Sequence, residues 1–305
     1  MNKIILKPGK DRSVFRYHPW IFSGAIARAD GHPQEGELVK VYSSDNRYLA
    51  TGHCQIGSIA VRILTFTDEP INYSFWKKRI EKAYQKREAI GLTPTPDNNV
   101  FRLVHGEGDN LPGLVIDYYA GVAVIQFHSV GMFLEKNNIV KALSEVLGSQ
   151  LTAIYDKSEG TLPYKAAIEP KNGYLYGKAE NFIALENGLK FNVDWLEGQK
   201  TGFFIDQREN RKLLEKYAYR KQVLNMFCYT GGFSFYAMRG GAESVDSVDV
   251  SARAIELTNQ NVELNFPGDT RHKAFAEEAF RFLEDSYNKY DLIILDPPAF
   301  AKHQN

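Results

Sequence analysis

In the last third of the chain, short apolar segments alternate regularly with amphipathic ones. Strand-like runs at 223–227, 244–250, 271–276 and 290–295 are separated by helix-like segments at 232–239, 252–264 and 277–283. This alternation predicts a parallel, doubly wound α/β sheet of the Rossmann-like kind, in which ligands bind beyond the carboxyl ends of the strands. Such a sheet usually has more than four strands, so we expect this domain to continue beyond Asn305.

The first two thirds of the chain predict two further domains. Short alternating runs at 37–42, 47–51 and 58–64, separated by turn residues, indicate a small N-terminal β-barrel or sandwich. A central α+β domain is indicated by a helix at 73–90, a hairpin at 114–127, a helix at 132–147 and a strand at 153–156. A polar hairpin and a helix at 206–217 precede the alternating part. We therefore expect three domains, at residues 1–72, 73–180 and 181–305.

Composition excludes several classes of protein. The 305 residues include 37 basic and 37 acidic ones, so a polyanionic partner would have to be held by local basic patches. Cys54 and Cys228 are too few for a disulfide framework or a cysteine-rich zinc site, and the seven histidines show no metal-ligand spacing. The sequence has no signal-like start and no run of 18 apolar residues, which argues against secretion and membrane insertion. We expect a cytoplasmic protein without a metal.

The loop after the first strand of the alternating part carries the first indication of a ligand. Gly231 and Gly232 allow the backbone to approach a ligand closely and place amide groups at a helix N-terminus. Asp249 ends the next strand, where a carboxylate can accept hydrogen bonds from ribose hydroxyls. The bulky Phe227 and Tyr229 fit a dinucleotide pyrophosphate poorly, which favours S-adenosylmethionine over NAD. The other interpretation of the glycine pair is a tight strand-to-helix turn.

The fourth strand ends in Asp296-Pro-Pro-Ala-Phe300, which is a more specific pattern. Two prolines predict a stiff, extended loop whose free carbonyls could hold a planar base near a methyl donor. Phe300 could stack on that base. The alternative is a strand end that is merely capped by prolines.

Together, residues 225–233, Asp249 and residues 296–300 resemble the motifs of class I S-adenosylmethionine-dependent methyltransferases. More narrowly, residues 198–211 resemble the segment before the first motif in the RlmI family of 23S ribosomal RNA cytosine-C5 methyltransferases. Residues 16–24 resemble that family's RNA-binding PUA domain, and residues 106–114 resemble its central domain. The resemblance extends over essentially the whole chain. It implies a PUA-like barrel, a central α+β domain and a Rossmann-like methyltransferase domain that transfers a methyl group to ribosomal RNA.

The resemblance also implies which residues bind the cofactor. Asp249 would hold the ribose, Glu278 or the adjacent Glu277 would lie beside the adenine, and Asp296 would face both the cofactor and the reacting base as the catalytic residue. For both glutamates the alternative is an ordinary carboxylate at a helix N-terminus. The remaining implied cofactor contacts are Thr201, Phe204, Gln207, Arg208, Phe227, Tyr229, Thr230 and Gly231.

Methylation of cytosine at C5 needs a cysteine thiolate, because C5 is not nucleophilic until a thiolate adds at C6. The resemblance implies that this cysteine lies on a later strand, beyond Asn305. We interpret Cys228, in the loop before Gly231, and Cys54, in the N-terminal domain, as small buried residues. The 305-residue chain is then expected to bind the cofactor without completing the reaction.

Large-subunit ribosomal RNA is the expected partner, with no membrane partner and a homodimer as a candidate assembly. Basic and aromatic residues near the barrel would form the RNA surface, and a solvated face with one buried tryptophan is the alternative. The basic helix at 73–90 could extend this surface. The base itself would meet the proline loop. The RNA contacts expected are Arg12, Arg16, His18, Trp20, Pro297, Pro298 and Phe300.

Three other functions stay open at this point. Asp-Pro-Pro loops also serve methylation of guanine or adenine amines, for which no cysteine is needed. A ribosome-assembly protein without catalysis would bind ribosomal RNA but not S-adenosylmethionine. A dinucleotide oxidoreductase is disfavoured by the bulky loop at 228–233.

Overall fold

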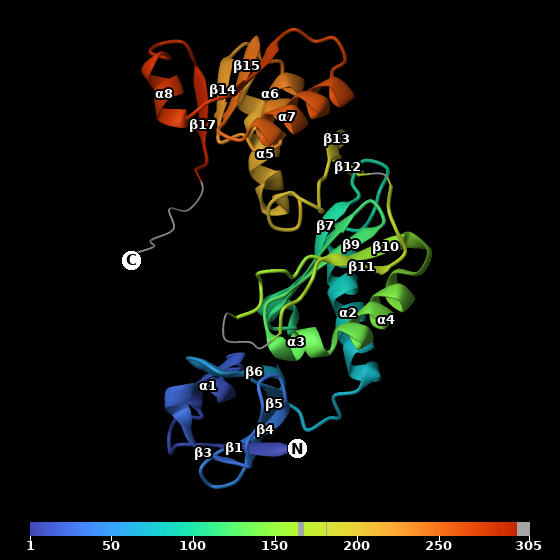
Figure 1. Ribbon diagram of the computed structural model, residues 1–305, viewed down its shortest axis with the longest axis vertical. Helices are drawn as coiled ribbons and strands as arrows, with labels where there is room; N and C mark the ends of the chain where they lie inside the picture. The colour runs from blue at the N-terminus through green and yellow to red at the C-terminus, as the bar shows by residue number, and fades with distance from the viewer. Residues whose placement is uncertain (164–167, 181, 298–305) are drawn as a thin grey trace. The chain divides into compact units, whose positions relative to one another are not determined.

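The computed structural model describes residues 1–163, 168–180 and 182–297 (Figure 1). The chain forms two compact units. The first comprises residues 1–95, 99–181 and 195–202, and the second comprises residues 96–98, 182–194 and 203–305. The first unit therefore contains the expected N-terminal and central domains, together with a segment at 195–202 from beyond the expected boundary at residue 180.

The N-terminal part of the first unit is a six-stranded sheet in the order β2-β6-β5-β4-β1-β3. Strand β1 pairs in parallel with β4, and the other neighbours are antiparallel. The alternating pattern buries Val39, Val41 and Val61 completely in one core, which confirms the strands predicted there. The elements are β1 (Asn2–Leu6), α1 (Arg12–Phe15), β2 (Trp20–Phe22), η1 (Ser23–Ala25), β3 (Ile26–Asp30), β4 (Leu38–Tyr42), β5 (Tyr48–Cys54) and β6 (Ile59–Thr65).

The central part of the first unit is a five-stranded sheet in the order β11-β10-β9-β8-β7. Its residues share one hydrophobic core with buried residues of three helices. The predicted hairpin is confirmed, since β8 and β9 pair in antiparallel register. The single helix predicted at 132–147 is wrong in detail, because two helices meet at Glu135, whose ψ of 6° departs from helical geometry. The elements are α2 (Tyr73–Ala89), β7 (Val100–His105), η2 (Gly106–Asp109), β8 (Leu114–Tyr119), β9 (Val122–Phe127), α3 (Val130–Leu134), α4 (Lys136–Leu147), η3 (Gly148–Gln150), β10 (Ala153–Asp156) and β11 (Gly173–Tyr176).

The second unit contains the predicted doubly wound sheet, with four parallel strands in the order β16-β15-β14-β17 (Figure 1). Met226, at the end of β14, is in register with Val248 of β15 and Leu295 of β17. The carboxyl ends of three strands therefore lie at one edge, where the loops after them can converge. The elements are β12 (Ile183–Glu186), β13 (Leu189–Asn192), η4 (Ile205–Gln207), α5 (Arg208–Tyr217), β14 (Gln222–Met226), α6 (Gly232–Arg239), β15 (Ser244–Asp249), α7 (Ala252–Asn265), β16 (His272–Ala276), α8 (Ala279–Glu284) and β17 (Leu292–Leu295).

No helix in the described ranges combines the length and the apolar character that crossing a membrane requires. Within the same ranges, no group of three or more His, Cys, Asp or Glu side chains is arranged to hold a metal ion. The fully buried carboxylates of Asp117 and Glu186 accept hydrogen bonds from arginine side chains. Arg102 donates to Asp117, and Arg211 donates to Glu186.

Candidate cofactor-binding site

The loop between β14 and α6 has an unusual backbone. Phe227 and Tyr229 adopt left-handed conformations, with φ of 54° and 50°, and Gly231 follows with φ of 80°. Left-handed conformations are costly for aromatic residues and cluster at ligand-binding sites, where surrounding contacts hold them. A β-carbon at Gly231 would lie 2.7 Å from Cγ2 of Thr258, so this position requires glycine for space as well as for φ.

Asp249, at the end of β15, joins this loop to the neighbouring strand. One carboxylate oxygen accepts a hydrogen bond of 2.9 Å from the Tyr229 amide, and the other accepts one of 2.9 Å from the Ser251 amide. The side chain is half-buried. Because a carboxylate can accept about four hydrogen bonds, roughly two acceptor positions are left for the hydroxyls of a ribose.

The segment before β14 contributes two further contacts between predicted site residues. The Phe204 ring packs edge-on against the Tyr229 ring, with centroids 5.3 Å apart. The Gln207 side-chain amide donates a hydrogen bond of 3.2 Å to the Asp296 carboxylate after β17. Residues from three separate motifs therefore lie along one edge of the sheet.

A buried ionic cluster beneath this edge was not predicted. Glu186, at the end of β12, is fully buried and accepts hydrogen bonds of 2.8 and 2.7 Å from Arg211 and one of 3.2 Å from Arg208. The Tyr236 hydroxyl donates to the same carboxylate at 3.0 Å. Arg211 also donates to the Phe204 carbonyl at 2.9 Å, so the cluster fixes the backbone that carries the Phe204 ring.

Arg208 and Thr201, which the sequence predicted to contact the cofactor, are hydrogen-bonded to buried carboxylates of the protein. Arg208 is buried, and its guanidinium is bonded to Glu186. Thr201 belongs to the first unit, is completely buried, and donates a hydrogen bond of 2.6 Å to Asp117. The Thr201 side chain therefore presents no accessible surface to a ligand. Thr230 is also buried, and its carbonyl accepts a hydrogen bond from Asn261.

The acidic pair at the start of α8 matches the alternative interpretation more closely. Glu278 is exposed and caps the helix, with its carboxylate accepting a hydrogen bond of 3.0 Å from the Arg281 amide. Glu277 is half-buried, lies 3.5 Å from the Arg281 guanidinium, and donates its amide to the Asp249 carbonyl at 3.0 Å. Glu277 is thus bonded directly to the end of β15.

The two cysteines differ in exposure. Cys228 is buried, as predicted, and burial together with the nearby Asp249 charge raises the pKa of its thiol to about 12. Cys54 is only half-buried, so the prediction that it is a buried residue is wrong, although partial burial raises the pKa of its thiol as well. Since the thiolate is the nucleophile, Cys228 is poorly suited to attack a base.

The predicted RNA contacts fall into three groups. Arg12, Arg16 and His18 are exposed on the first unit. Trp20 is half-buried, and its indole N–H donates a hydrogen bond of 2.8 Å to Glu107, so this residue ties the N-terminal sheet to the η2 loop. Pro297 is exposed, whereas Pro298 and Phe300 lie outside the described residues.

The fold and the loop geometry define the class of protein. A parallel sheet with a strained, glycine-containing loop after its central strand and a carboxylate at the end of the next strand is typical of domains that bind a nucleoside-bearing cofactor. Residues 101–304 match the family of S-adenosylmethionine-dependent methyltransferases, and residues 4–66 match PUA-like domains. The chain belongs to the S-adenosylmethionine-dependent methyltransferase family, and its cofactor is S-adenosylmethionine.

Named relatives and solved structures agree with this assignment. The chain is 37% identical over 310 residues to ribosomal RNA large subunit methyltransferase I of Aeromonas salmonicida, and 39% identical over 311 residues to the protein of that name from Vibrio vulnificus. Each match covers 98% of this chain and 76% of the relative. A S-adenosylmethionine-dependent methyltransferase from Streptococcus mutans superposes with a TM-score of 0.82 at 25% identity, covering 98% of this chain and 77% of the other. A methyltransferase solved in complex with SAH superposes with a TM-score of 0.84 at 25% identity, and the match covers 100% of this chain and 78% of the other.

Proposed function

We propose that this methyltransferase acts on a base of large-subunit ribosomal RNA, at C5 of a cytosine, in the cytoplasm. The observation that carries the proposal is the hydrogen bond between the Tyr229 amide and Asp249, which joins the strained loop to the adjacent strand end in a methyltransferase fold. The relatives' printed name, ribosomal RNA large subunit methyltransferase I, supports the choice of RNA. The PUA-like match at residues 4–66 supports an RNA-binding domain at residues 1–72. We propose that a central domain at 73–180 and the methyltransferase domain at 181–305 follow it.

The residues at the sheet edge fit the cofactor. We assign the ribose hydroxyls to the remaining acceptor positions of Asp249, and the aromatic walls of the site to Phe204, Phe227 and Tyr229. Gly231 allows close approach of the backbone. When bound, S-adenosylmethionine supplies an electrophilic methyl group. We assign the adenine side to Glu277 or Glu278.

Asp296 is the residue that we place beside the target base. Gln207 holds one of its carboxylate oxygens, and the side chain is exposed after β17. A carboxylate there can accept a hydrogen bond from the exocyclic amine of cytosine and so orient the ring. Pro297 follows directly, and we retain Pro298 and Phe300 as further candidates for contact with the base.

The C5 chemistry requires a nucleophilic cysteine that adds to C6 and leaves again after C5 has lost its proton. Cys228 does not fit this role, because its thiol is buried and its pKa is raised to about 12. Cys54 lies on β5 of the N-terminal sheet. We therefore propose a nucleophile on a strand that follows Asn305 in sequence. We also propose that the protein forms a homodimer, which sedimentation of the purified chain would test.

Deletion of the gene in its host tests the proposed reaction. We expect 23S ribosomal RNA from the deletion strain to lack one 5-methylcytidine, measured by nuclease digestion and mass spectrometry of the nucleosides. Re-expression of the gene should restore it, and a copy carrying Asp249→Ala should restore it poorly. Loss of an N-methylated guanosine or adenosine instead would show that the enzyme methylates an amine. An unchanged nucleoside profile would contradict ribosomal RNA as the substrate.

A further inference from the structure

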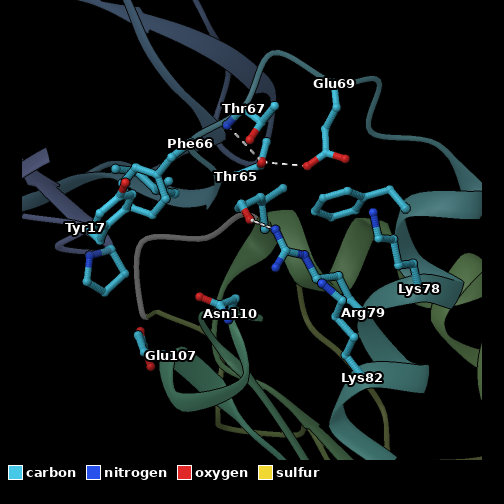
Figure 2. A pocket seen from close by; sticks show the side chains of 14 residues that line it. Tyr17, Thr65, Phe66, Thr67, Glu69, Lys78, Arg79, Lys82, Glu107 and Asn110 are labelled. Carbon is cyan, nitrogen blue, oxygen red and sulfur yellow. Dashed lines mark hydrogen bonds between the residues drawn. The ribbon is translucent and has the colours of Figure 1, made fainter. Parts of the chain in front are cut away.

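A pocket of about 440 Å³ lies in the first unit, between the end of β6 and the helix α2 (Figure 2). Its walls come from the N-terminal sheet, from α2 and from the η2 loop of the central part. The volume lies in the range of small-ligand sites, which is about 300–1,000 Å³. None of the residues predicted one by one to contact the cofactor or the RNA lines this pocket. Its basic residues belong to the helix at 73–90, which the sequence indicated as a possible extension of the RNA surface.

The basic residues of α2 fall into two groups, those that are paired within the fold and those that are not. The helix carries six basic residues, and four of them are engaged within the fold: Lys77 pairs with Glu145 at 2.9 Å, Arg79 donates to the Leu64 carbonyl at 2.8 Å, and Lys86 and Arg87 both pair with Asp109. Lys78 and Lys82 make no hydrogen bond or ion pair with any residue in the part of the chain that the structure describes.

Lys78 and Lys82 are four residues apart, so both project from the same face of α2, and both line the pocket (Figure 2). The two acidic residues of the wall have other partners. Glu107 is held by Trp20 and by Arg62, and Glu69 accepts a hydrogen bond of 2.7 Å from Thr65. With Arg79 also in the wall, cations outnumber carboxylates, so the pocket favours an anion.

The opposite side of the pocket carries an exposed aromatic ring. Tyr17 is 73% exposed and adopts φ of 59°, a left-handed conformation that is costly for a tyrosine. Its ring makes a T-shaped contact with Phe66, with centroids 5.1 Å apart, and at 73% exposure most of Tyr17 remains accessible for stacking. Asn110, on the η2 side, is exposed with φ of 57°, and its side-chain amide has no hydrogen-bond partner in the described ranges.

We propose that this pocket binds one nucleotide of single-stranded RNA outside the methylated base, with the base stacked on Tyr17 and its edge read by Asn110, and with the flanking phosphates held by Lys78 and Lys82. Unpaired cations beside an exposed aromatic platform are the combination that single-stranded nucleic acid requires. An acidic peptide would use the lysines but would have no need of the ring. The proposal rests on the proposed function, since it takes RNA as the substrate.

The test measures binding of a fluorescent single-stranded oligoribonucleotide to the full 305-residue chain by anisotropy. The double variant Lys78→Gln, Lys82→Gln should bind about tenfold more weakly at low salt. The plot of log affinity against log salt has a negative slope, and its magnitude should decrease by about 1.4, because each of the two phosphate contacts contributes about 0.7. The matched control is Lys171→Gln, Lys178→Gln, which removes the same charge from exposed positions of the same unit that do not line the pocket. It should leave both quantities close to wild type.

Two variants of Tyr17 separate the role of the ring from that of the hydroxyl. Tyr17→Asn suits the left-handed backbone but removes the ring, and should weaken binding between about 5- and 150-fold, the range for one stacked base. Tyr17→Phe keeps the ring and should bind like wild type. Affinity that is unchanged in Tyr17→Asn and in the lysine double variant would overturn the pocket assignment while leaving RNA as the substrate.

Two further outcomes separate the alternatives. If wild-type protein does not bind the oligoribonucleotide, the proposed RNA substrate fails, and the pocket assignment fails with it. In a competition experiment, free CMP and unlabelled oligoribonucleotide are each used to displace the fluorescent oligoribonucleotide. If both compete at the same concentration, the pocket is a mononucleotide site, and the assignment to an RNA strand is overturned. Displacement only by the oligoribonucleotide supports the proposal.

Discussion

The Tyr229 amide donates a hydrogen bond of 2.9 Å to the carboxylate of Asp249, which lies twenty residues further along the chain at the end of the neighbouring strand. Tyr229 makes this bond from a left-handed backbone conformation, and the Phe204 ring packs against its side chain. The bond therefore joins two motifs that are separate in sequence. It leaves part of the carboxylate available for the cofactor.

Gly231→Ala should destabilise the second unit and abolish cofactor binding. The new methyl group would lie 2.7 Å from Thr258 and 2.9 Å from Phe235, and φ of 80° would be strained, so we expect a loss of about 2 to 4 kcal/mol in the free energy of unfolding. The control is Gly268→Ala, which has a similar φ of 73° but nothing within 4 Å of the added carbon, and should cost about 1 kcal/mol. Urea denaturation compares the two, and equal losses would show that the contact with Thr258 does not matter.

Glu186→Gln should be far more destabilising than a charge change usually is. The substitution leaves the guanidiniums of Arg208 and Arg211 buried beside a neutral amide, and removal of one partner from a buried ion pair costs about 3 to 5 kcal/mol. Glu215→Gln breaks a similar two-bond pair with Arg239, but at a partly exposed position, and should cost about 1 kcal/mol or less. A small effect of Glu186→Gln in chemical denaturation would contradict the role assigned to this cluster.

The stability of the first unit should fall below neutral pH because of His53. This side chain is 2% exposed, and burial lowers its pKa from 6.5 to about 4, so the unfolded chain binds a proton in this interval and the folded chain does not. The contribution is complete above pH 6.5 and is lost as the pH falls toward 4, with a slope of about 1.4 kcal/mol per pH unit. His53→Phe keeps a ring to stack on Trp76 and should flatten the pH dependence by that amount. An unaltered slope in denaturation curves between pH 4 and 7 would exclude His53 as its source.

The sequence predicted the sheets well because their patterns depend on local alternation. The run at 38–42 has an alternating burial pattern, the run at 244–249 carries two buried valines among polar residues, and both form strands close to the predicted limits. The glycine at 231 and the carboxylate at 249 could be predicted as site residues because their position after a strand carries the signal, and the structure places them in one loop and at the adjacent strand end.

Other parts of the site depend on contacts that no local pattern encodes. Glu186 lies in a polar hairpin and would be expected on the surface, yet it is fully buried by arginines that follow more than twenty residues later. The left-handed conformations of Phe227 and Tyr229 contradict local preference and are imposed by the surrounding fold. Trp20 was expected to face RNA, but its indole N–H is bonded to a glutamate 87 residues away.

The most direct test of the account is calorimetric titration of the 305-residue chain with S-adenosylmethionine, performed on wild type, Asp249→Ala and Asp246→Ala. Wild type should bind with a dissociation constant in the range of roughly 1 μM to 1 mM. Asp249→Ala should lose about 1 to 3 kcal/mol of binding free energy, because hydrogen bonds to a charged group are removed. Asp246 lies on the same strand but bonds to Tyr290, so Asp246→Ala should keep wild-type affinity. Wild-type affinity in Asp249→Ala, or no binding by the wild-type chain, would contradict the site proposed at the ends of β14 and β15.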